Sequence, residues 1–310
     1  MSGHIPVLLD EVLETLSPRD GARYIDGTFG GGGYASAILE AADCSVLGID
    51  RDPDAIARGQ ALVAKFAGRL TLVQGCFSDM STLAPGKADG VVLDLGVSSF
   101  QFDEPERGFS FRADGPLDMR MAKDGESAAD FVNTASEKDL AYVLYRYGEE
   151  HQSRRIARAI VAARPVTRTA ELAKIVSDAL GPAAQRYPIH PATRTFQALR
   201  IRVNDELGEL ERGLDAATDV LADHGRLGIV SFHSLEDRIV KRYLAERSTT
   251  APKASRHAPP NFGPGDRRAG TPLYRLITTR PRSPSAAETE RNPRARSAHL
   301  RAAERLRSPS

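Results

Sequence analysis

The chain has 310 residues, of which 41% are hydrophobic and 27% are charged, and its formal net charge is +1. This composition is ordinary for a globular protein, and the length allows two domains. It argues against a membrane protein, because the longest apolar runs have the length of strands. The first sixteen residues lack a basic segment followed by an apolar one, which predicts no signal peptide and a cytoplasmic location.

The cysteine count and the charge distribution narrow the possible ligands. Cys44 and Cys76 are too few for a four-ligand zinc site, so we predict no metal centre. Residues 151–202 hold ten Lys and Arg against two acids, and residues 238–310 hold seventeen against five. Basic segments beside an acidic remainder predict a polyanionic partner such as nucleic acid. The alternative is that the Arg-rich stretches are only solvated helix faces.

The most informative stretch is 24–54, whose pattern predicts a strand, a glycine-rich turn, a helix, a second strand and an acid. Residues 26–33 contain five glycines, and the second strand ends at Asp50. Glycines let a backbone approach a ligand closely, and the N-terminus of the next helix offers free N–H groups. An acid at the tip of the second strand can accept ribose hydroxyls. The stretch predicts a Rossmann-like α/β nucleotide-binding fold.

Asp26 bears on which nucleotide this turn binds. A carboxylate inside the turn repels a pyrophosphate but attracts an ammonium or a sulfonium. S-adenosylmethionine carries both of these groups, together with a ribose for Asp50. The spacing Gly30-x-Gly32-x-x-Ala35 also fits a dinucleotide site. A dinucleotide-dependent oxidoreductase and a purely structural glycine turn therefore stay as alternatives.

Two further strands place candidate residues at the same edge of the sheet. Residues 70–73 predict a third strand, after which we expect Phe77 either to contact the adenine or to fill the core. Residues 90–95 predict a fourth strand with Asp94 near its carboxyl end, where ligands bind in open α/β sheets. The chain lacks the Pro-Pro-aromatic sequence common after this position in amino-methyltransferases, which weighs against the adenine-amino and DNA cytosine-amino groups.

The remaining strands follow a long helical region. Residues 228–232 predict a fifth strand, and His233 after it either assists proton transfer or holds a loop. Residues 272–278 alternate in polarity and predict a late strand. Between the fourth and fifth strands, residues 103–121 predict an ordered loop, and residues 127–192 have only helical patterns. Residues 193–214 predict one long amphipathic helix.

These patterns predict a discontinuous α/β domain, residues 1–108 and 200–310, interrupted by a helical insertion at 109–199. Residues 248–271 and 283–310 are predicted to be flexible, because they are rich in Pro, Gly and basic residues. The insertion also supplies five arginines as candidate phosphate contacts, namely Arg154, Arg155, Arg158, Arg164 and Arg168.

Eight blocks of the sequence resemble the RsmH/MraW family of bacterial ribosomal RNA methyltransferases. They are HIPVLL (4–9), DGTFGGGG (26–33), DRDP (50–53), LDLGVSS (93–99), ERGFSF (106–111), DGPLDMRM (114–121), SFHSLED (231–237) and NPRARS (292–297). The resemblance runs almost end to end. It implies a Rossmann-like class I S-adenosylmethionine-dependent methyltransferase sheet with an inserted all-helical domain. The resemblance thus implies that residues 1–108 and 200–310 are a methyltransferase domain and that residues 109–199 are a substrate-recognition insertion.

The resemblance also implies the reaction, which is methylation of the exocyclic N4 amine of one cytosine in the decoding region of 16S rRNA. Carried over by motif, the cofactor contacts are Gly32, Gly33, Tyr34, Asp50, Phe77, Asp94 and Gln101. The family commonly has His in place of Tyr34, so this contact is expected through the backbone. Phe100 stands where Pro is frequent, which leaves the path to Gln101 open.

For the chemistry, we expect an acceptor for the amine proton near the tip of the fourth strand. Asp94 is the first candidate, with the backbone carbonyl groups of Leu95 and Gly96 as alternatives and His233 as a weaker one. The expected partner is the small ribosomal subunit or its 16S rRNA. A homodimer is left open, and an RNA-binding chaperone without catalysis is a third possible function.

Overall fold

The computed structural model describes residues 6–182, 190–248 and 271–307. The chain divides into two compact units, of which the first contains residues 1–50, 54–96 and 210–310. The second unit contains residues 51–53 and 97–209. The described residues include no helix with the length and apolar character needed to cross a membrane.

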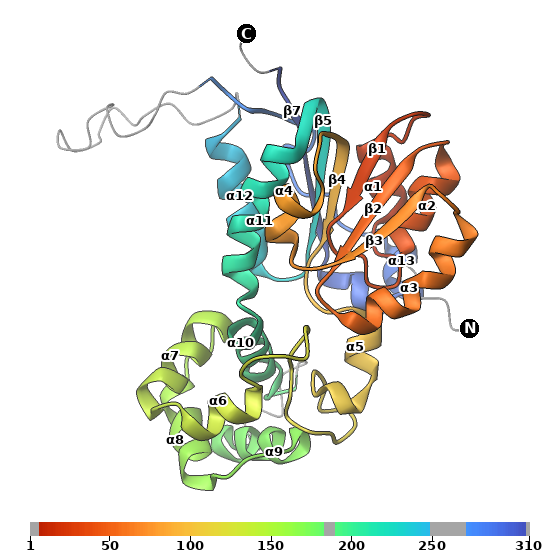
Figure 1. Ribbon diagram of the computed structural model, residues 1–310. Helices are drawn as coiled ribbons and strands as arrows, with labels where there is room; N and C mark the ends of the chain where they lie inside the picture. Colours follow the sequence, from red (N-terminus) through yellow and green to blue (C-terminus); the bar gives the residue numbers. More distant parts are fainter. Residues whose placement is uncertain (1–5, 183–189, 249–270, 308–310) are drawn as a thin grey trace, which may run out of the picture. The chain divides into compact units, whose positions relative to one another are not determined.

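The first unit is built on a sheet of seven strands in the order β3-β2-β1-β4-β5-β7-β6 (Figure 1). Its strands are β1 (Arg23–Asp26), β2 (Ser45–Asp50), β3 (Leu70–Gln74), β4 (Ala88–Asp94), β5 (Leu221–Ser231), β6 (Tyr274–Leu276) and β7 (His299–Arg305). The strands β1 to β5 pair in parallel with one another, whereas β7 is antiparallel to both β5 and β6. This arrangement confirms the predicted Rossmann-like sheet. The strand order reverses between β1 and β4, where such folds bind their ligands.

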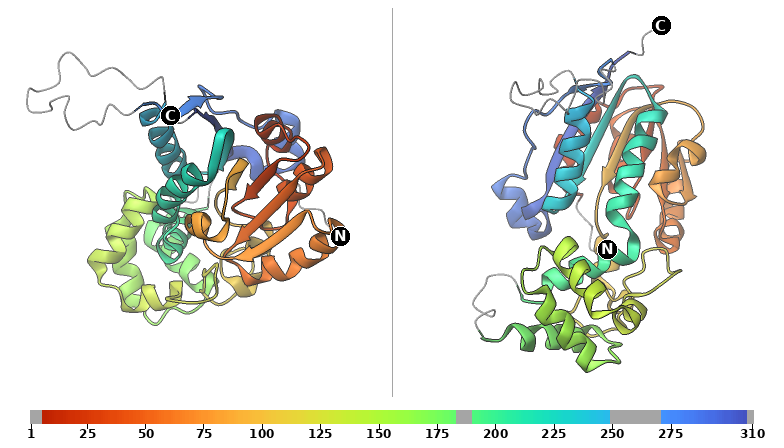
Figure 2. Two further views of the ribbon diagram at one scale, coloured as in Figure 1. Left: turned by 45° about the horizontal axis from the view of Figure 1, so that its top comes forward. Right: turned by 90° about the vertical axis from the view of Figure 1, so that its left-hand side faces the viewer.

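Helices cover both faces of this sheet (Figure 2). They are α1 (Leu9–Leu16), α2 (Gly33–Ala41), α3 (Pro53–Lys65), α4 (Met80–Leu83), α11 (Glu206–Val220), α12 (Ser234–Glu246) and α13 (Ala286–Arg291). Successive strand residues point to opposite faces. Thus Tyr24 packs with residues of α1 and α2, and Ile25 packs with residues of α4, α11 and α12. Both faces are buried, as a parallel sheet requires.

The C-terminal segment corrects the prediction that residues 283–310 are flexible. Residues 285–305 are built into the first unit as α13, the 3₁₀ helix η4 (Pro293–Ser297) and β7. The strand β7 lies between β5 and β6 and is buried along most of its length. The predicted flexible segment 248–271 lies outside the described residues, except for its two end residues.

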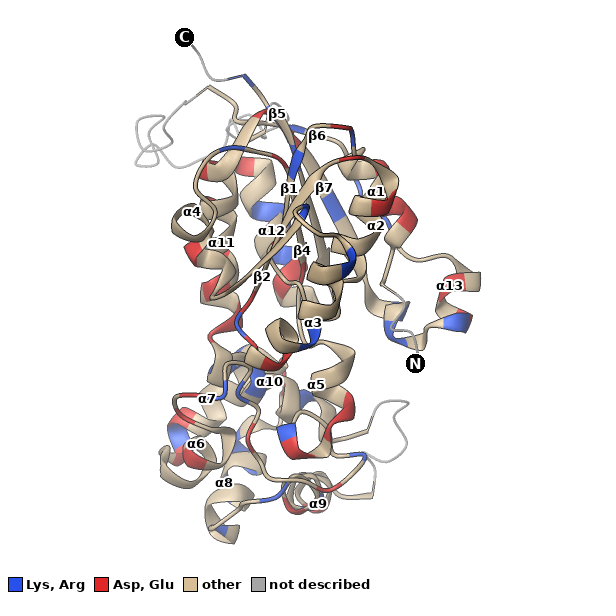
Figure 3. Ribbon diagram, turned by 45° about the vertical axis from the view of Figure 1, so that its right-hand side comes forward, with Lys and Arg blue, Asp and Glu red and all other residues tan. Residues whose placement is uncertain are grey.

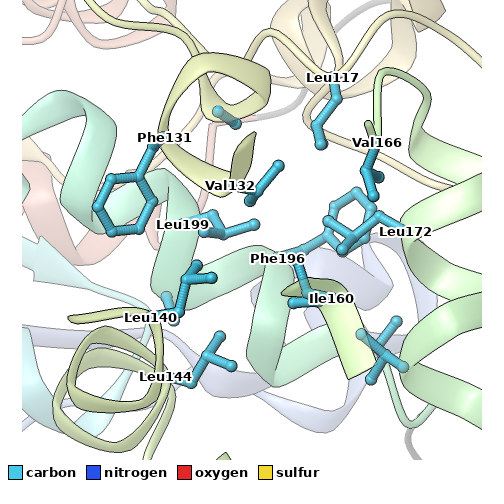
Figure 4. Packing of buried hydrophobic residues seen from close by; sticks show 14 of the residues in the cluster. Leu117, Phe131, Val132, Leu140, Leu144, Ile160, Val166, Leu172, Phe196 and Leu199 are labelled. Atoms are coloured by element: carbon cyan, nitrogen blue, oxygen red, sulfur yellow. The ribbon is translucent and has the colours of Figure 1, made fainter. Parts of the chain in front are cut away.

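The second unit is helical. Its helices are α5 (Ser99–Asp103), α6 (Ala128–Thr134), α7 (Glu137–Gly148), α8 (Ser153–Ala163), α9 (Thr169–Leu180) and α10 (Thr193–Asn204), with the 3₁₀ helix η2 (Pro105–Arg107). Side chains from α6 to α10 and from the loop before α6 converge on one apolar core (Figure 4). The predicted helix 193–214 is two helices, because Asp205 adopts a left-handed φ of 47° between α10 and α11.

Candidate active site

Two carboxylates mark the ligand-binding edge of the first unit. Asp26 ends β1 and Asp94 ends β4, and these two strands pair in parallel. The backbone N–H of Asp94 donates to Thr28 Oγ1 at 2.6 Å, so the turn after β1 reaches directly to the tip of β4. The sheet thus places Asp26 and Asp94 at the point where the strand order reverses.

The glycine-rich turn connects these strands to β2. Gly30 and Gly32 have φ values of 53° and 74°, which L-residues with side chains rarely adopt. The N–H of Gly30 donates to Asp50 Oδ2 at 2.7 Å, and the backbone N–H of Gly75 donates to the Asp50 carbonyl at 2.9 Å. The turn, β2 and β3 are therefore fixed relative to Asp50, as the predicted ribose contact requires.

The carboxylates of Asp26 and Asp94 are poorly compensated in the described structure. Asp26 is fully buried, and Thr28 N–H donates to its Oδ1 at 3.2 Å. Its Oδ2 and the Oδ1 of Asp94 are buried without a hydrogen-bond partner among the described residues. Burial raises the pKa of Asp26 to about 7, and the charge of Asp50 adds to this effect. Burial also raises the pKa of Asp94 well above its usual range, assisted by the charges of Asp26 and Glu236.

Two neighbouring carboxyl groups that each have a buried oxygen without a hydrogen-bond partner among the described residues suit a cationic ligand. A buried anion is costly unless a positive charge or hydrogen-bond donors compensate it. The described residues donate hydrogen bonds to only some of the carboxyl oxygens of Asp26 and Asp94. A ligand with a positive charge would compensate the remaining oxygens. An ammonium and a sulfonium fit this requirement, whereas a pyrophosphate does not.

Tyr34 and Phe77 are placed by packing. Burial raises the pKa of Tyr34 well above its usual range, and its hydroxyl donates to the Val7 carbonyl oxygen. The Tyr34 hydroxyl is therefore already hydrogen-bonded within the protein. This agrees with the prediction that Tyr34 contacts a ligand through its backbone. Phe77 opens the 3₁₀ helix η1 (Phe77–Asp79), and its ring lies against the Cα of Gly213 so closely that a Cβ at 213 would overlap it. This contact favours the core-filling alternative for the ring.

Gln101 belongs to the second unit, where both polar atoms of its side chain are engaged. Its Oε1 accepts from the N–H of Ser98 at 3.0 Å, and its Nε2 donates to Asp52 Oδ2 at 2.9 Å. The same carboxylate oxygen accepts from Arg107 Nη1 at 2.8 Å, and all three side chains are buried. Arg107 also donates to the carbonyls of Arg120 and Met121 at 3.1 and 2.9 Å.

This network explains how the loop at 103–121 is held. Asn204 continues it, since its Nδ2 donates to the Met119 carbonyl at 2.7 Å and its Oδ1 accepts from Met121 N–H at 2.8 Å. Sequence analysis did not identify Asp52 or Asn204 as supports, because their partners lie far along the chain. Gln101 is thus a structural member of this network, and its contact with a cofactor stays a prediction.

His233 is the N-cap of α12. Its Nδ1 accepts from the N–H of Glu236 at 3.4 Å, and its Nε2 lies 3.1 Å from Glu236 Oε1. In return, Glu236 Oε2 accepts from the backbone N–H of Phe232 at 2.8 Å. These capping contacts agree with the loop-holding alternative for His233. Its Nε2 is buried without a hydrogen-bond partner among the described residues, so a role in proton transfer stays a prediction.

The five predicted phosphate contacts separate into two groups. Arg164 donates to the carbonyls of Val132 and Ala135, and Arg168 pairs with Asp114 at 2.5 Å, so both support the fold. Arg154, Arg155 and Arg158 lie exposed on α8, opposite its buried residues Ile156 and Ile160. Figure 3 shows that Lys and Arg are interspersed with acids on the helices of this unit.

The second unit also contains a cavity of about 420 Å³ that the sequence did not predict. Phe131, Tyr142, Tyr147 and Arg202 are among its lining residues. The guanidinium of Arg202 lies 4.8 Å from the centre of the Phe131 ring and 3.2 Å from Glu126 Oε2. Tyr142 is 59% exposed, so an aromatic residue at this cavity is accessible to a ligand.

Comparisons with known proteins give consistent results along the whole chain. The model of the MraW methylase family matches residues 1–306. Ribosomal RNA small subunit methyltransferase H of Gluconobacter oxydans is 58% identical, over 97% of this chain and 93% of that protein. The protein of the same name from Parvibaculum lavamentivorans is 57% identical, over 100% of this chain and 91% of that protein. Among solved structures, an rRNA methylase from Streptococcus thermophilus aligns with a TM-score of 0.42 at 9% identity, over 96% of this chain and 93% of that one.

Proposed function

Because this chain belongs to the MraW methylase family, we propose that it methylates the exocyclic N4 amine of one cytosine in the decoding region of 16S rRNA. It is an S-adenosylmethionine-dependent methyltransferase, and the dinucleotide alternative has no support. The rRNA substrate rests on the relatives, which are named ribosomal RNA small subunit methyltransferase H. A cytoplasmic location follows from this substrate. The observation that supports the chemical assignment is Asp94 Oδ1 at the tip of β4, a buried atom with no hydrogen-bond partner among the described residues.

Each candidate residue has a defined task in this proposal. The cofactor supplies the methyl group on a sulfonium. Asp26 compensates the positive charge of the cofactor beneath the glycine turn, and Asp50 accepts hydrogen bonds from the ribose hydroxyl groups. Gly32, Gly33 and Tyr34 offer backbone groups at the start of α2, and Phe77 and Gln101 stay predicted contacts.

Asp94 accepts the proton that the amine loses. A cytosine amine is a poor nucleophile, because its lone pair is delocalised into the ring. Alignment of the reacting groups supplies roughly 7–11 kcal/mol, and a placed proton acceptor adds to this.

The helical unit is proposed to bind the RNA around the target. Exposed arginines on α8 suit phosphates, and the aromatic cavity near Arg202 suits an unstacked base. The target cytosine is expected to leave its stack to reach the active site.

The direct test is transfer of radiolabelled methyl groups to small ribosomal subunits, followed by nucleoside analysis of the rRNA. We expect label in N4-methylcytidine at a single position. Free 16S rRNA and 23S rRNA serve as comparison substrates. If the protein binds S-adenosylmethionine but no label reaches the rRNA, the family and cofactor stand and the proposed substrate is wrong.

The α8 arginines give a second prediction. A protein in which Arg154, Arg155 and Arg158 are all replaced by Gln should bind its RNA more weakly and with a smaller salt dependence. Each lost phosphate contact reduces the slope of log K against log salt by about 0.7–0.9. The measurement is a salt titration of RNA affinity. The matched control replaces Arg242, which pairs with Glu211 on the first unit, and an unchanged slope in the triple variant would contradict the role.

A further inference from the structure

The structure assigns to Glu288 a positioning role in the cofactor site: from the C-terminal helix α13 it holds the segment 6–8 over the glycine turn. Glu288 Oε1 accepts from the backbone N–H of Leu8 at 2.7 Å, across 280 residues of sequence. This inference rests on the proposed assignment of Gly33 and Tyr34 to the cofactor.

The segment 6–8 lies directly on the glycine turn. A Cβ at Gly33 would overlap the ring of Pro6, so there is no space between them for a side chain. One residue further along each segment, the Tyr34 hydroxyl donates to the Val7 carbonyl. Val7 and Leu8 are buried in the same core cluster as Tyr34. Any displacement of Pro6–Val7 therefore reaches the backbone of Gly33 and Tyr34.

Leu8 is the point at which this segment needs an external support. Its φ of 53° and ψ of 37° are left-handed, a conformation that is unfavourable for a residue with a branched side chain. It is also the N-cap of α1, and its own apolar side chain makes no capping hydrogen bond. The carboxylate of Glu288 satisfies the Leu8 N–H, which holds the segment in this conformation.

Glu288 is itself held in place. Its N–H donates to Ser285 Oγ at 3.1 Å, which caps α13. The preceding Arg282 pairs with Leu300 of β7 through two backbone hydrogen bonds of 2.9 and 2.8 Å. Arg282 Nη2 also lies 3.2 Å from Glu14 Oε1 on α1. The C-terminal segment is thus anchored to the sheet on one side and to α1 on the other.

The test measures cofactor affinity of the full-length protein by isothermal titration calorimetry with S-adenosylmethionine. Glu288→Ala should raise Kd about tenfold, because a charge-assisted hydrogen bond is lost. Glu288→Gln keeps an acceptor and should restore Kd to within about threefold of the wild type. The matched control is Glu290→Ala, an exposed residue of the same helix, which should leave Kd unchanged.

A coupling measurement separates positioning from general destabilisation. Tyr34→Phe releases the Val7 carbonyl, so it acts on the same segment as Glu288→Ala. The two effects on Kd should therefore be less than additive in the double variant. An unchanged Kd for Glu288→Ala would overturn the inference, even with a lowered melting temperature. Asp50→Ala distinguishes this from failure of the proposed site: wild-type cofactor affinity in that variant would mean that the cofactor binds elsewhere.

Discussion

Replacing Asp94 with Asn is expected to lower kcat by about 100- to 10,000-fold, the range typical for loss of a placed proton acceptor. Burial raises the pKa of the Asp94 carboxyl well above its usual range, with added effects from the charges of Asp26 and Glu236. A nearby positive charge has the opposite effect on this pKa and favours the ionised acceptor. The Asn side chain has a similar shape and no charge, so the variant should fold normally. Single-turnover methyl transfer to small subunits measures the loss.

The matched control is Asp89→Asn, on the same strand but at its opposite end. Asp89 pairs with Arg19 at 2.5 Å and accepts from the N–H of Arg23, both away from the ligand edge. Its replacement should leave kcat unchanged. If Asp94→Asn bound the cofactor and turned over at the wild-type rate, Asp94 would not be the acceptor, and the carbonyls of Leu95 and Gly96 would be the next candidates.

The parallel part of the sheet could be predicted because each strand carries its own signal. The strands β1 to β4 are short apolar runs ending in polar residues, and such runs need no knowledge of distant partners. The glycine turn and Asp50 were predicted for the same reason. Their spacing follows from local backbone geometry within one strand–turn–helix unit.

The strand β7 could not be predicted, because its charged residues hide its burial. Arg301 and Glu304 are only 9% and 8% exposed, although they interrupt the apolar pattern. Each is compensated by a residue remote in sequence: Arg301 pairs with Asp237 at 2.7 and 2.9 Å, and Glu304 with Arg275 at 2.7 Å. Sequence patterns assign such residues to the surface unless the partner is known.

The residues that hold the site in place were not predicted, for a related reason. The sequence shows Asp52 as part of the motif at 50–53, but its pairing with Arg107 requires two segments 55 residues apart in sequence to meet. Glu288 stands in a segment whose composition predicts flexibility, yet its carboxylate reaches α1. The sequence therefore identifies residues that face the ligand more readily than residues that hold them, because holding depends on tertiary contacts.

Asp26 should make both stability and cofactor affinity depend on pH. Its pKa is about 7 in the folded protein, chiefly through burial, against 3.8 for an ordinary Asp. Below about pH 4 it is protonated in both the folded and the unfolded chain. Between pH 4 and 7 only the unfolded chain loses the proton, so the stability of the free protein falls with rising pH and levels off above 7. A shift of this size corresponds to at most about 4 kcal/mol.

Asp26→Asn should therefore stabilise the free protein at pH 8 by about 2–4 kcal/mol, and this gain should disappear near pH 4. The same change should weaken S-adenosylmethionine binding about 10- to 100-fold at pH 8, because the ionised carboxylate that compensates the cation is lost. Denaturant unfolding and calorimetry at both pH values measure these effects, with the exposed Asp20→Asn as control.

Binding of the cation to wild-type protein below pH 7 should release a proton, since the ionised form of Asp26 is the one that attracts the ligand. Calorimetry in buffers of different ionisation enthalpy detects this release, and Asp26→Asn should reduce it. If the variant gained no stability at pH 8 while proton release stayed at the wild-type value, Asp26 would not be the buried acid that the cofactor ionises. Asp94, whose carboxyl pKa is also raised by burial, would then be the group that titrates.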